Sequence, residues 1–114
     1  MSDCLFCKIA AKEIPARIVH EDEYCVAFDD INPQAPMHVL VIPRKHISRV
    51  SEIKQEDREL VGHLMLVGSS VAASRGFSES GFRIIANCNA DAGQDVFHIH
   101  FHVLGGRKMG WPPG

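Results

Sequence analysis

Histidine alternates with large apolar residues in the segment Phe97-His98-Ile99-His100-Phe101-His102-Val103-Leu104. Alternate side chains of an extended strand share a face, so this pattern predicts three imidazoles on one face and apolar packing on the other. Imidazole has an ordinary pKa of about 6.5 and can act as base, nucleophile or metal ligand near neutral pH. A solvent-facing polar stripe is the competing interpretation, but such a face more often carries Thr, Lys or Glu.

Other hydrophobic patterns predict short strands around one main helix. Apolar residues recur at helical spacing from Leu60 to Val71, and Gly76 is placed to stop that helix. A short helix is expected at 4–12, with Asp3 as its N-cap and Pro15 beyond its end. Strands are expected at 17–21, 24–28, 37–43 and 82–87, with loops at 29–36 and 88–95. Together with the histidine strand, these elements indicate an α+β fold built on a five-stranded antiparallel sheet.

Length and charge narrow the class of protein. A chain of 114 residues with 46% hydrophobic content suits one domain spanning residues 1–114. The net charge of -2 creates no field that would gather nucleic acid or anionic lipid. No apolar run approaches the roughly 20 residues of a membrane span, and the N-terminus does not resemble a signal peptide. We therefore expect a cytoplasmic protein with no nucleic-acid or membrane partner, whose four cysteines serve metal binding or packing.

The spacing of the three histidines argues against one shared ion. At a rise of about 3.3 Å per residue, His98 and His102 are about 13 Å apart along a strand. Neighbouring pairs could still chelate a metal, but different tasks for the three residues fit this spacing at least as well.

The histidine segment resembles the histidine triad (HIT) motif, and the resemblance covers most of the chain. Further matching segments, similar to the Hint branch of that family, are Asp30-Ile31-Asn32-Pro33-Gln34-Ala35-Pro36, His38, Val41-Ile42-Pro43-Arg44-Lys45-His46-Ile47, Leu104-Gly105-Gly106-Arg107 and Trp111-Pro112-Pro113-Gly114. The resemblance implies a HIT-like fold that pairs into a homodimer with a continuous sheet. It also implies a hydrolase of purine nucleoside 5′-phosphoramidates, with an AMP- or GMP-type ligand and no organic cofactor.

The resemblance assigns roles to individual residues. His100 matches the nucleophile that forms a covalent nucleotidyl-histidine intermediate, which splits one difficult displacement into two. His102 matches the residue that hydrogen-bonds the phosphoryl group, and His38 completes the histidine cluster. Asn87, Gly93 and Gln94 match the loop placed against the phosphate and the leaving group. The implied catalytic set is His100, His102, His38, Asn87, Gln94 and Asp95.

A nucleoside pocket is implied by the same resemblance. Phe6, Phe28 and Ile31 match its apolar walls, and Asp30 matches the carboxylate that accepts from the ribose hydroxyls. Core packing competes as an explanation for the three apolar residues, and an ordinary turn competes for Gly93. The complete implied nucleotide-binding set is Phe6, Phe28, Asp29, Asp30, Ile31, Asn87, Gly93, Gln94, Asp95, Val96, His100, His102 and Trp111. In Hint proteins the tail that carries this tryptophan crosses the dimer interface and contributes to the partner's active site.

Two positions depart from the Hint pattern. Asp95 stands where several members carry a hydroxyl residue near the scissile bond. A carboxylate there can receive a proton or interact with an amine, but it repels phosphate when ionised and unpaired. This leaves the leaving-group preference open. Ala92 replaces a glycine that is often found there, a minor change in the loop.

The pair Cys4 and Cys7 is a candidate metal site. Residues three apart on a helix share a face, and thiolates with imidazoles are the preferred zinc ligands. Some HIT branches bind structural zinc through such a pair and two histidines, which correspond here to His46 and His98. Redox activity or simple packing are the alternatives for the pair. Cys25 and Cys88 are expected to pack, and His20 and His63 are expected at surface positions.

Two further functions remain open at this point. The same site could hydrolyse dinucleoside polyphosphates or adenylylated intermediates, although the 29–36 match and the C-terminal tail favour the Hint branch. The chain could also be a zinc-stabilised module that binds a nucleotide or a protein partner with little catalysis.

Overall fold

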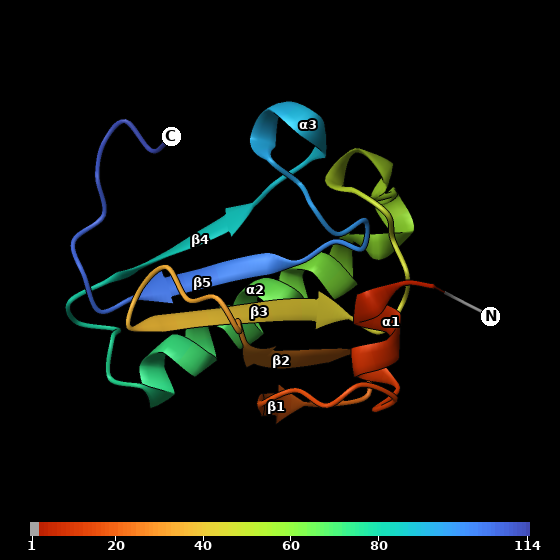
Figure 1. Ribbon diagram of the computed structural model, residues 1–114, viewed down its shortest axis with the longest axis horizontal. Helices are drawn as coiled ribbons and strands as arrows, with labels where there is room; N and C mark the ends of the chain where they lie inside the picture. The colour runs from red at the N-terminus through yellow and green to blue at the C-terminus, as the bar shows by residue number, and fades with distance from the viewer. Residues whose placement is uncertain (1–2) are drawn as a thin grey trace.

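Five strands form one antiparallel sheet in the computed structural model, which describes residues 3–114 (Figure 1). They are β1 (Ile18–Glu21), β2 (Cys25–Asp29), β3 (Met37–Pro43), β4 (Phe82–Ala86) and β5 (Phe101–Gly105). The order across the sheet is β1-β2-β3-β5-β4, so β2, β3 and β5 are flanked on both sides and β1 and β4 are the edges. The five-stranded antiparallel sheet predicted from the sequence is confirmed.

One long helix covers one face of this sheet, and a short helix lies against the other face near one end (Figure 1). The long helix α2 (Arg58–Ser74) follows two short 3-10 turns, η1 (Val50–Glu52) and η2 (Gln55–Asp57). It ends just before Gly76, whose φ of +85° favours glycine. The short helix is α1 (Leu5–Ala10), and a further single turn, α3 (Asn89–Ala92), precedes β5.

The core divides into two apolar clusters because neighbouring strand side chains point to opposite faces. On the α2 side, Leu64 and Val71 pack with Val41 and Val103 of the central strands. On the α1 side, Phe6 and Ile9 pack with Phe28, Leu40 and Ile42. All seven residues of β3 are buried, as expected for a strand covered on both faces. His38 therefore lies in a rigid strand, on the same face as Leu40 and Ile42.

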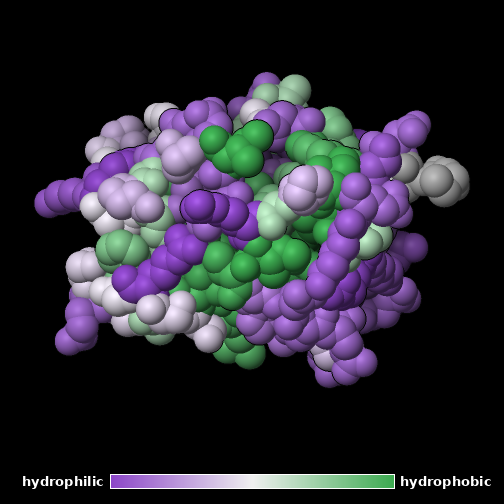
Figure 2. Space-filling model, turned by 60° about the horizontal axis from the view of Figure 1, so that its bottom comes forward, coloured by the Kyte–Doolittle hydropathy of each residue, from purple (hydrophilic) through white to green (hydrophobic). Residues whose placement is uncertain are grey.

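Apolar residues also reach the surface. Figure 2 shows a hydrophobic band across one face of the molecule, bordered by hydrophilic residues. The exposed large apolar side chains include Val19, Tyr24, Leu66 and Trp111. Within residues 3–114, none of the helices combines the length and apolar content that crossing a lipid bilayer requires.

The prediction of a continuous histidine strand is wrong for its first half. β5 begins at Phe101, and residues 97–100 form an irregular segment before it. β3 pairs with β5 only as far as Val41, opposite Phe101. Beyond that point, Ile99 N–H donates to the carbonyl of Ile47 at 2.8 Å instead of joining the sheet. The alternation of side chains persists nevertheless, because Ile99, Phe101 and Val103 all enter the core on the α2 side.

The predicted short elements also need correction. Helix α1 is shorter than 4–12, and its N-cap is Cys4 rather than Asp3 because Cys4 Sγ accepts from the N–H of Cys7 at 3.3 Å. Lys12, with φ of +62°, has left the helix. The segment 88–95, expected to be loop throughout, contains the single turn α3.

A contact between two distant segments positions the loop before His38. Arg107 Nε donates to the carbonyl of Gln34 at 2.9 Å. Gly106 has φ of +94°, and a Cβ there would come within 2.7 Å of Pro36. A glycine is therefore required for this close approach. The contact fixes the loop that precedes β3.

Candidate active site and metal cluster

A cavity of about 470 Å³ opens on the α1 face of the sheet. This size lies within the range of roughly 300–1,000 Å³ typical of small-molecule sites. Its apolar part is formed by α1, β2 and β3 and includes Phe6, Phe28 and Leu40. Its polar part is lined by His38, His100, His102, Asp30 and Asp95. His98 does not line this cavity and is completely buried, so the structure separates it from the other two triad histidines.

The imidazole of His100 is held in one tautomer. Its Nδ1 lies 2.8 Å from the main-chain carbonyl of His98. A carbonyl only accepts, so Nδ1 carries the proton and Nε2 has the lone pair. The ring is 5% exposed and packs edge-on against Phe6, with centroids 5.0 Å apart. His100 therefore presents an oriented nucleophilic nitrogen on a ring that lines the cavity.

The proton positions on His38 and His102 follow from a chain of hydrogen bonds. The backbone N–H of Gln34 donates to His38 Nδ1 at 3.0 Å, so a neutral His38 carries its proton on Nε2. His38 Nε2 lies 2.9 Å from His102 Nδ1 and donates to it. His102 then carries its own proton on Nε2. The result is a neutral His102 with an N–H that can donate to a phosphoryl oxygen.

Burial keeps these two histidines neutral. Burial lowers the pKa of His102 to about 4, and the neighbouring His100 and His38 act in the same direction. Burial also lowers the pKa of His38, opposed by the charge of Asp30, whose Oδ2 lies 3.4 Å from His38 Nε2. The hydrogen-bond chain is therefore in its neutral form at pH 7.

The loop between β4 and β5 is braced by Gln94. Its Oε1 accepts from the N–H of Asn89, and its Nε2 donates to the carbonyls of Ser48 and Val96. The Gln94 amide, assigned a catalytic role from the sequence, is thus engaged by the protein itself and lies outside the cavity lining. Asn87, which is half-buried, also lies outside that lining.

Gly93 has a conformational reason for being glycine. Its φ is +81°, and its N–H donates to the carbonyl of Ala90 at 3.0 Å. The N–H of Gln94 likewise donates to the carbonyl of Asn89. Both donors are therefore used within the loop in this conformation, which matches the turn interpretation of the glycine.

Asp95 and Val96 follow directly and both line the cavity. Asp95 is exposed, and no hydrogen bond or ion pair of its carboxylate is found within residues 3–114. Its negative charge raises the pKa of His102 slightly against the stronger effect of burial. The structure thus places an unpaired carboxylate at the rim beside the reactive histidines.

The residues predicted to contact the nucleoside differ in whether their side chains are already engaged within the protein. Asp30 lines the cavity and accepts from the N–H of Asn32 through Oδ1 at 2.8 Å. Asp29 also lines it, but its carboxylate pairs with both terminal nitrogens of Arg75 in α2. Ile31 is 99% exposed and has no packing role in the chain, in contrast to the buried Phe6 and Phe28. An exposed isoleucine at the rim is available to a ligand.

Trp111 stands apart from the cavity. Its side chain is 83% exposed, and the segment after β5 lies at the opposite end of the sheet from α1 (Figure 1). Trp111 is also absent from the cavity lining. Within one chain, this residue is not part of the site formed by the other predicted contacts.

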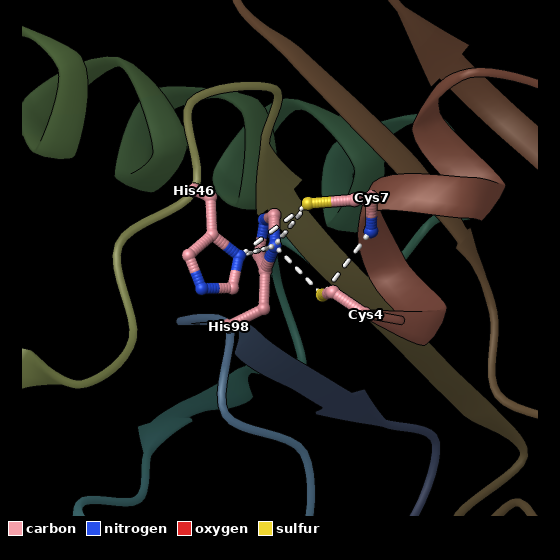
Figure 3. A group of neighbouring side chains, drawn as sticks. All are labelled: Cys4, Cys7, His46 and His98. Atoms are coloured by element: carbon pink, nitrogen blue, oxygen red, sulfur yellow. Dashed lines mark hydrogen bonds between the residues drawn. The ribbon is translucent and has the colours of Figure 1, made fainter. Parts of the chain in front are cut away.

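A cluster of four side chains lies at the N-terminal end of α1 and consists of Cys4, Cys7, His46 and His98 (Figure 3). Their ligand atoms all lie within 4.8 Å of one another, although the four residues come from three separate segments. His98 Nε2 lies 2.7 Å from the carbonyl of Pro43, which fixes its proton on Nε2 and leaves Nδ1 directed at the thiols. This group can hold a metal ion.

The metal cluster and the cavity share a wall. Phe6 lies between Cys4 and Cys7 on α1, lines the cavity, and packs edge-on against both His98 and His100. His98 also supplies the carbonyl that orients His100. The geometry of the cluster is therefore connected to the geometry of the nucleophile by two direct contacts.

A second polar cluster was not expected from the sequence. His20 of β1 and His63 of α2 each place Nε2 2.8 Å from Asp22 Oδ2. Asp22 Oδ1 accepts from the N–H groups of Tyr24 and Cys25. Burial tends to raise the pKa of Asp22, but these four hydrogen bonds hold it well below its usual range. His20 and His63 thus join the β1–β2 turn to α2, a contact between residues 41 positions apart that no local pattern indicates.

The remaining cysteines behave differently from each other. Cys25 is fully buried as predicted, and burial, together with Asp22, raises the pKa of its thiol to about 12. Cys88 is only half-buried, and its Sγ lies 3.7 Å from Ser51 Oγ. The packing prediction is confirmed for Cys25, whereas Cys88 is only partly buried because it follows β4 at the N-terminus of α3.

Comparison with known proteins agrees with this arrangement. The chain is 52% identical over 112 residues to an uncharacterized HIT-like protein of Synechocystis sp., covering 98% of this chain and 97% of the relative. Its fold is similar to that of a HIT family hydrolase from Legionella pneumophila, with a TM-score of 0.97, 50% identity and coverage of 98% of this chain and 100% of the other. A histidine triad protein from Clostridium difficile has a TM-score of 0.93, 44% identity and 96% coverage of both chains. The family model for the HIT domain matches residues 11–109, and this chain belongs to the HIT family.

Proposed function

We propose that this HIT protein hydrolyses purine nucleoside 5′-phosphoramidates through a covalent nucleotidyl intermediate on His100. The observation that carries the proposal is the hydrogen bond from His100 Nδ1–H to the His98 carbonyl, which leaves Nε2 as the only nucleophilic nitrogen of that ring. A purine would lie against the apolar wall of the cavity, to which Phe6, Phe28 and Leu40 contribute. The ribose hydroxyls would then reach Asp30, and the phosphorus would lie at His100 and His102.

In the first step, the lone pair of His100 Nε2 forms a bond to phosphorus. The bond from phosphorus to the substrate amine breaks, and its electron pair stays with the amine nitrogen, which has been protonated by solvent. The His100 ring is then bonded at Nε2 and protonated at Nδ1, so it carries a positive charge. The His98 carbonyl stabilises that charge because it accepts from Nδ1–H.

In the second step, water attacks phosphorus and releases a proton to solvent, and the electron pair of the phosphorus–histidine bond returns to Nε2. The water enters in line with the bond that breaks, from the side the amine has left. The phosphoryl oxygens carry negative charge in both steps. The Nε2–H of His102, oriented by His38, donates to one of them.

We further propose that Cys4, Cys7, His46 and His98 hold a structural zinc ion. Tetrahedral zinc, with Zn–S of about 2.3 Å and Zn–N of about 2.0 Å, separates sulfur from nitrogen ligands by about 3.5 Å and two nitrogens by about 3.3 Å. Three of the four sulfur–nitrogen distances are 3.4, 3.4 and 3.5 Å, and the two Nδ1 atoms are 3.2 Å apart. These values match four of the six edges of that tetrahedron, and all the ligand atoms lie within 4.8 Å of one another. The four side chains fill its corners, as in structural rather than catalytic sites.

A homodimer is part of the same proposal, and β4 is the edge that suits it. Strand β1 carries an irregular register and the charged Glu21, features that disfavour pairing with another chain. Strand β4 has a regular register and side chains that are mostly half-buried. Pairing of two β4 strands would continue the sheet across the dimer. The exposed Trp111 would then be available to the partner's cavity.

Kinetics with an adenosine 5′-phosphoramidate test the enzymatic proposal. We expect His100→Ala to lower kcat at least 1,000-fold, on the order of losses seen when a nucleophile is removed, while AMP binding changes little. His20→Ala, a substitution outside the cavity, should keep its activity. Equal turnover by wild type and His100→Ala would refute the nucleophile, and high-affinity AMP binding without turnover by wild type would favour a binding module.

A further inference from the structure

Asp95 has no role in orienting the reactive histidines, yet it lies beside them. It lines the same cavity as His100 and His102, and its charge acts on His102. The tautomers of His38, His100 and His102 are set by Gln34 N–H and the His98 carbonyl, without any contribution from Asp95. The carboxylate is therefore free to interact with a ligand.

The backbone around Asp95 is held in place. The preceding Gln94 is 8% exposed and makes three hydrogen bonds, one of them to the carbonyl of Val96 directly after Asp95. These bonds hold the backbone on both sides of Asp95, which keeps the residue at the rim of the cavity. Asp30, the other cavity carboxylate near the histidines, accepts from Asn32 N–H, lies close to His38 and is the proposed acceptor for the ribose hydroxyls, so it has a different task from Asp95.

The position of the substrate determines which of its groups lies nearest Asp95. The nucleoside occupies the apolar part of the cavity and phosphorus lies at His100, so the leaving group must depart through the polar, solvent-facing side. Asp95 is an exposed cavity residue on that side. An ionised carboxylate attracts a nearby cation and repels a nearby anion, and exposure to solvent keeps the effect small.

We propose that Asp95 selects the leaving group by charge, favouring phosphoramidates whose departing amine carries an additional positive group and disfavouring those with an anionic group. The inference rests on the proposed phosphoramidate hydrolysis and names the substrate class of that same site. It also separates this chain from a hydrolase of dinucleoside polyphosphates, because their departing phosphates would meet an unpaired negative charge.

Three AMP phosphoramidates of similar length test the charge preference. Their amine parts are 1,5-diaminopentane, which retains a distal ammonium, hexylamine, which is neutral, and 6-aminohexanoate, which is anionic. For wild type we expect kcat/KM to be about fivefold higher for the cationic than for the neutral substrate and lowest for the anionic one, since about 1 kcal/mol corresponds to that factor. The preference should shrink as salt is raised.

Variants assign the preference to one residue. Asp95→Asn should bring the three kcat/KM values within about twofold of one another, and Asp95→Glu should restore their order. Asp91→Asn is the matched control, because Asp91 is an exposed carboxylate on α3 outside the cavity lining. It removes the same charge and should preserve the wild-type order.

The outcomes separate this inference from the function on which it rests. If wild type turns over none of the three substrates, the phosphoramidate hydrolysis itself fails. If wild type turns over all three equally, or if Asp95→Asn keeps the full preference, the hydrolysis stands and the role of Asp95 is overturned. If Asp91→Asn also loses the preference, the preference depends on the net charge of the protein, and the role of Asp95 is overturned.

Discussion

The three triad histidines differ because each ring has a different hydrogen-bond partner. His98 directs Nδ1 at two thiols, His100 donates to a main-chain carbonyl, and His102 accepts from His38. The alternating sequence predicts their shared side, and their spacing favours separate tasks. The tautomers do not follow from sequence, because they depend on the Gln34 N–H and the His98 carbonyl, whose directions only the folded backbone sets.

The depressed pKa of His102 predicts how stability varies with pH. Its folded pKa is about 4, below the ordinary value of 6.5, so the unfolded chain binds more protons between these two pH values. Stability therefore falls as pH is lowered from 6.5 to 4. His102→Gln removes this contribution and should give a shallower fall in Tm over that window, measured by thermal scans at matched salt. Parallel pH profiles for the two proteins would contradict the depressed pKa.

At the scale of elements, β3 and α2 were predictable because each has a strong local pattern. Seven consecutive buried residues form β3, and apolar residues at helical spacing form α2. The irregular start of the histidine segment was not predictable, since alternation continues past the point where sheet pairing stops. The joining of His20, Asp22 and His63 was missed for a related reason, because it depends on how the β1–β2 turn meets α2.

Helix α1 is expected to depend on the metal ion. It has only six residues, and a helix of that length is not stable without tertiary contacts. Cys7→Ser should reduce bound zinc from about one ion per chain to much less. It should also lower Tm by roughly 5–10 °C, because a ligand that binds only the folded state stabilises it. AMP affinity should fall as well, since Phe6 of the same helix lines the cavity.

Elemental analysis, thermal scans and AMP titration measure these three effects. Cys88→Ser is the matched control, because it removes a thiol that lies beside Ser51 rather than in the cluster. It should retain zinc, Tm and AMP affinity. Wild-type protein that holds no zinc after dialysis against the metal would refute the proposed site.

At the scale of the whole molecule, the cavity of one chain lacks one predicted component. Trp111 is exposed and does not line the cavity, and the segment after β5 that carries it lies at the other end of the sheet from α1 (Figure 1). We propose that it serves the cavity of a second chain. The sequence resemblance implies such a dimer. The regular register of β4 and the irregular register of β1 are visible only in the fold.

Sedimentation equilibrium at micromolar concentration should give twice the mass of the chain. Ile85→Lys places a charge on β4 and should shift the equilibrium toward monomer. Val19→Lys, on the opposite edge strand β1, should leave the dimer intact. A monomeric wild type, or dimers lost only in Val19→Lys, would exclude pairing through β4. Circular dichroism checks that both variants remain folded.

The proposed mechanism depends on a covalent bond between His100 and phosphorus, and this bond can be trapped. Wild-type protein is mixed briefly with an adenosine 5′-phosphoramidate, quenched, digested at a pH that preserves phosphorus–nitrogen bonds, and sequenced by tandem mass spectrometry. We predict an added AMP group on His100 itself, absent from His100→Ala and present in His20→Ala. His100 would be excluded as the nucleophile by an AMP group on His98, on His102 or on the His100→Ala protein. Turnover with no adduct at any quench time would also contradict a covalent intermediate.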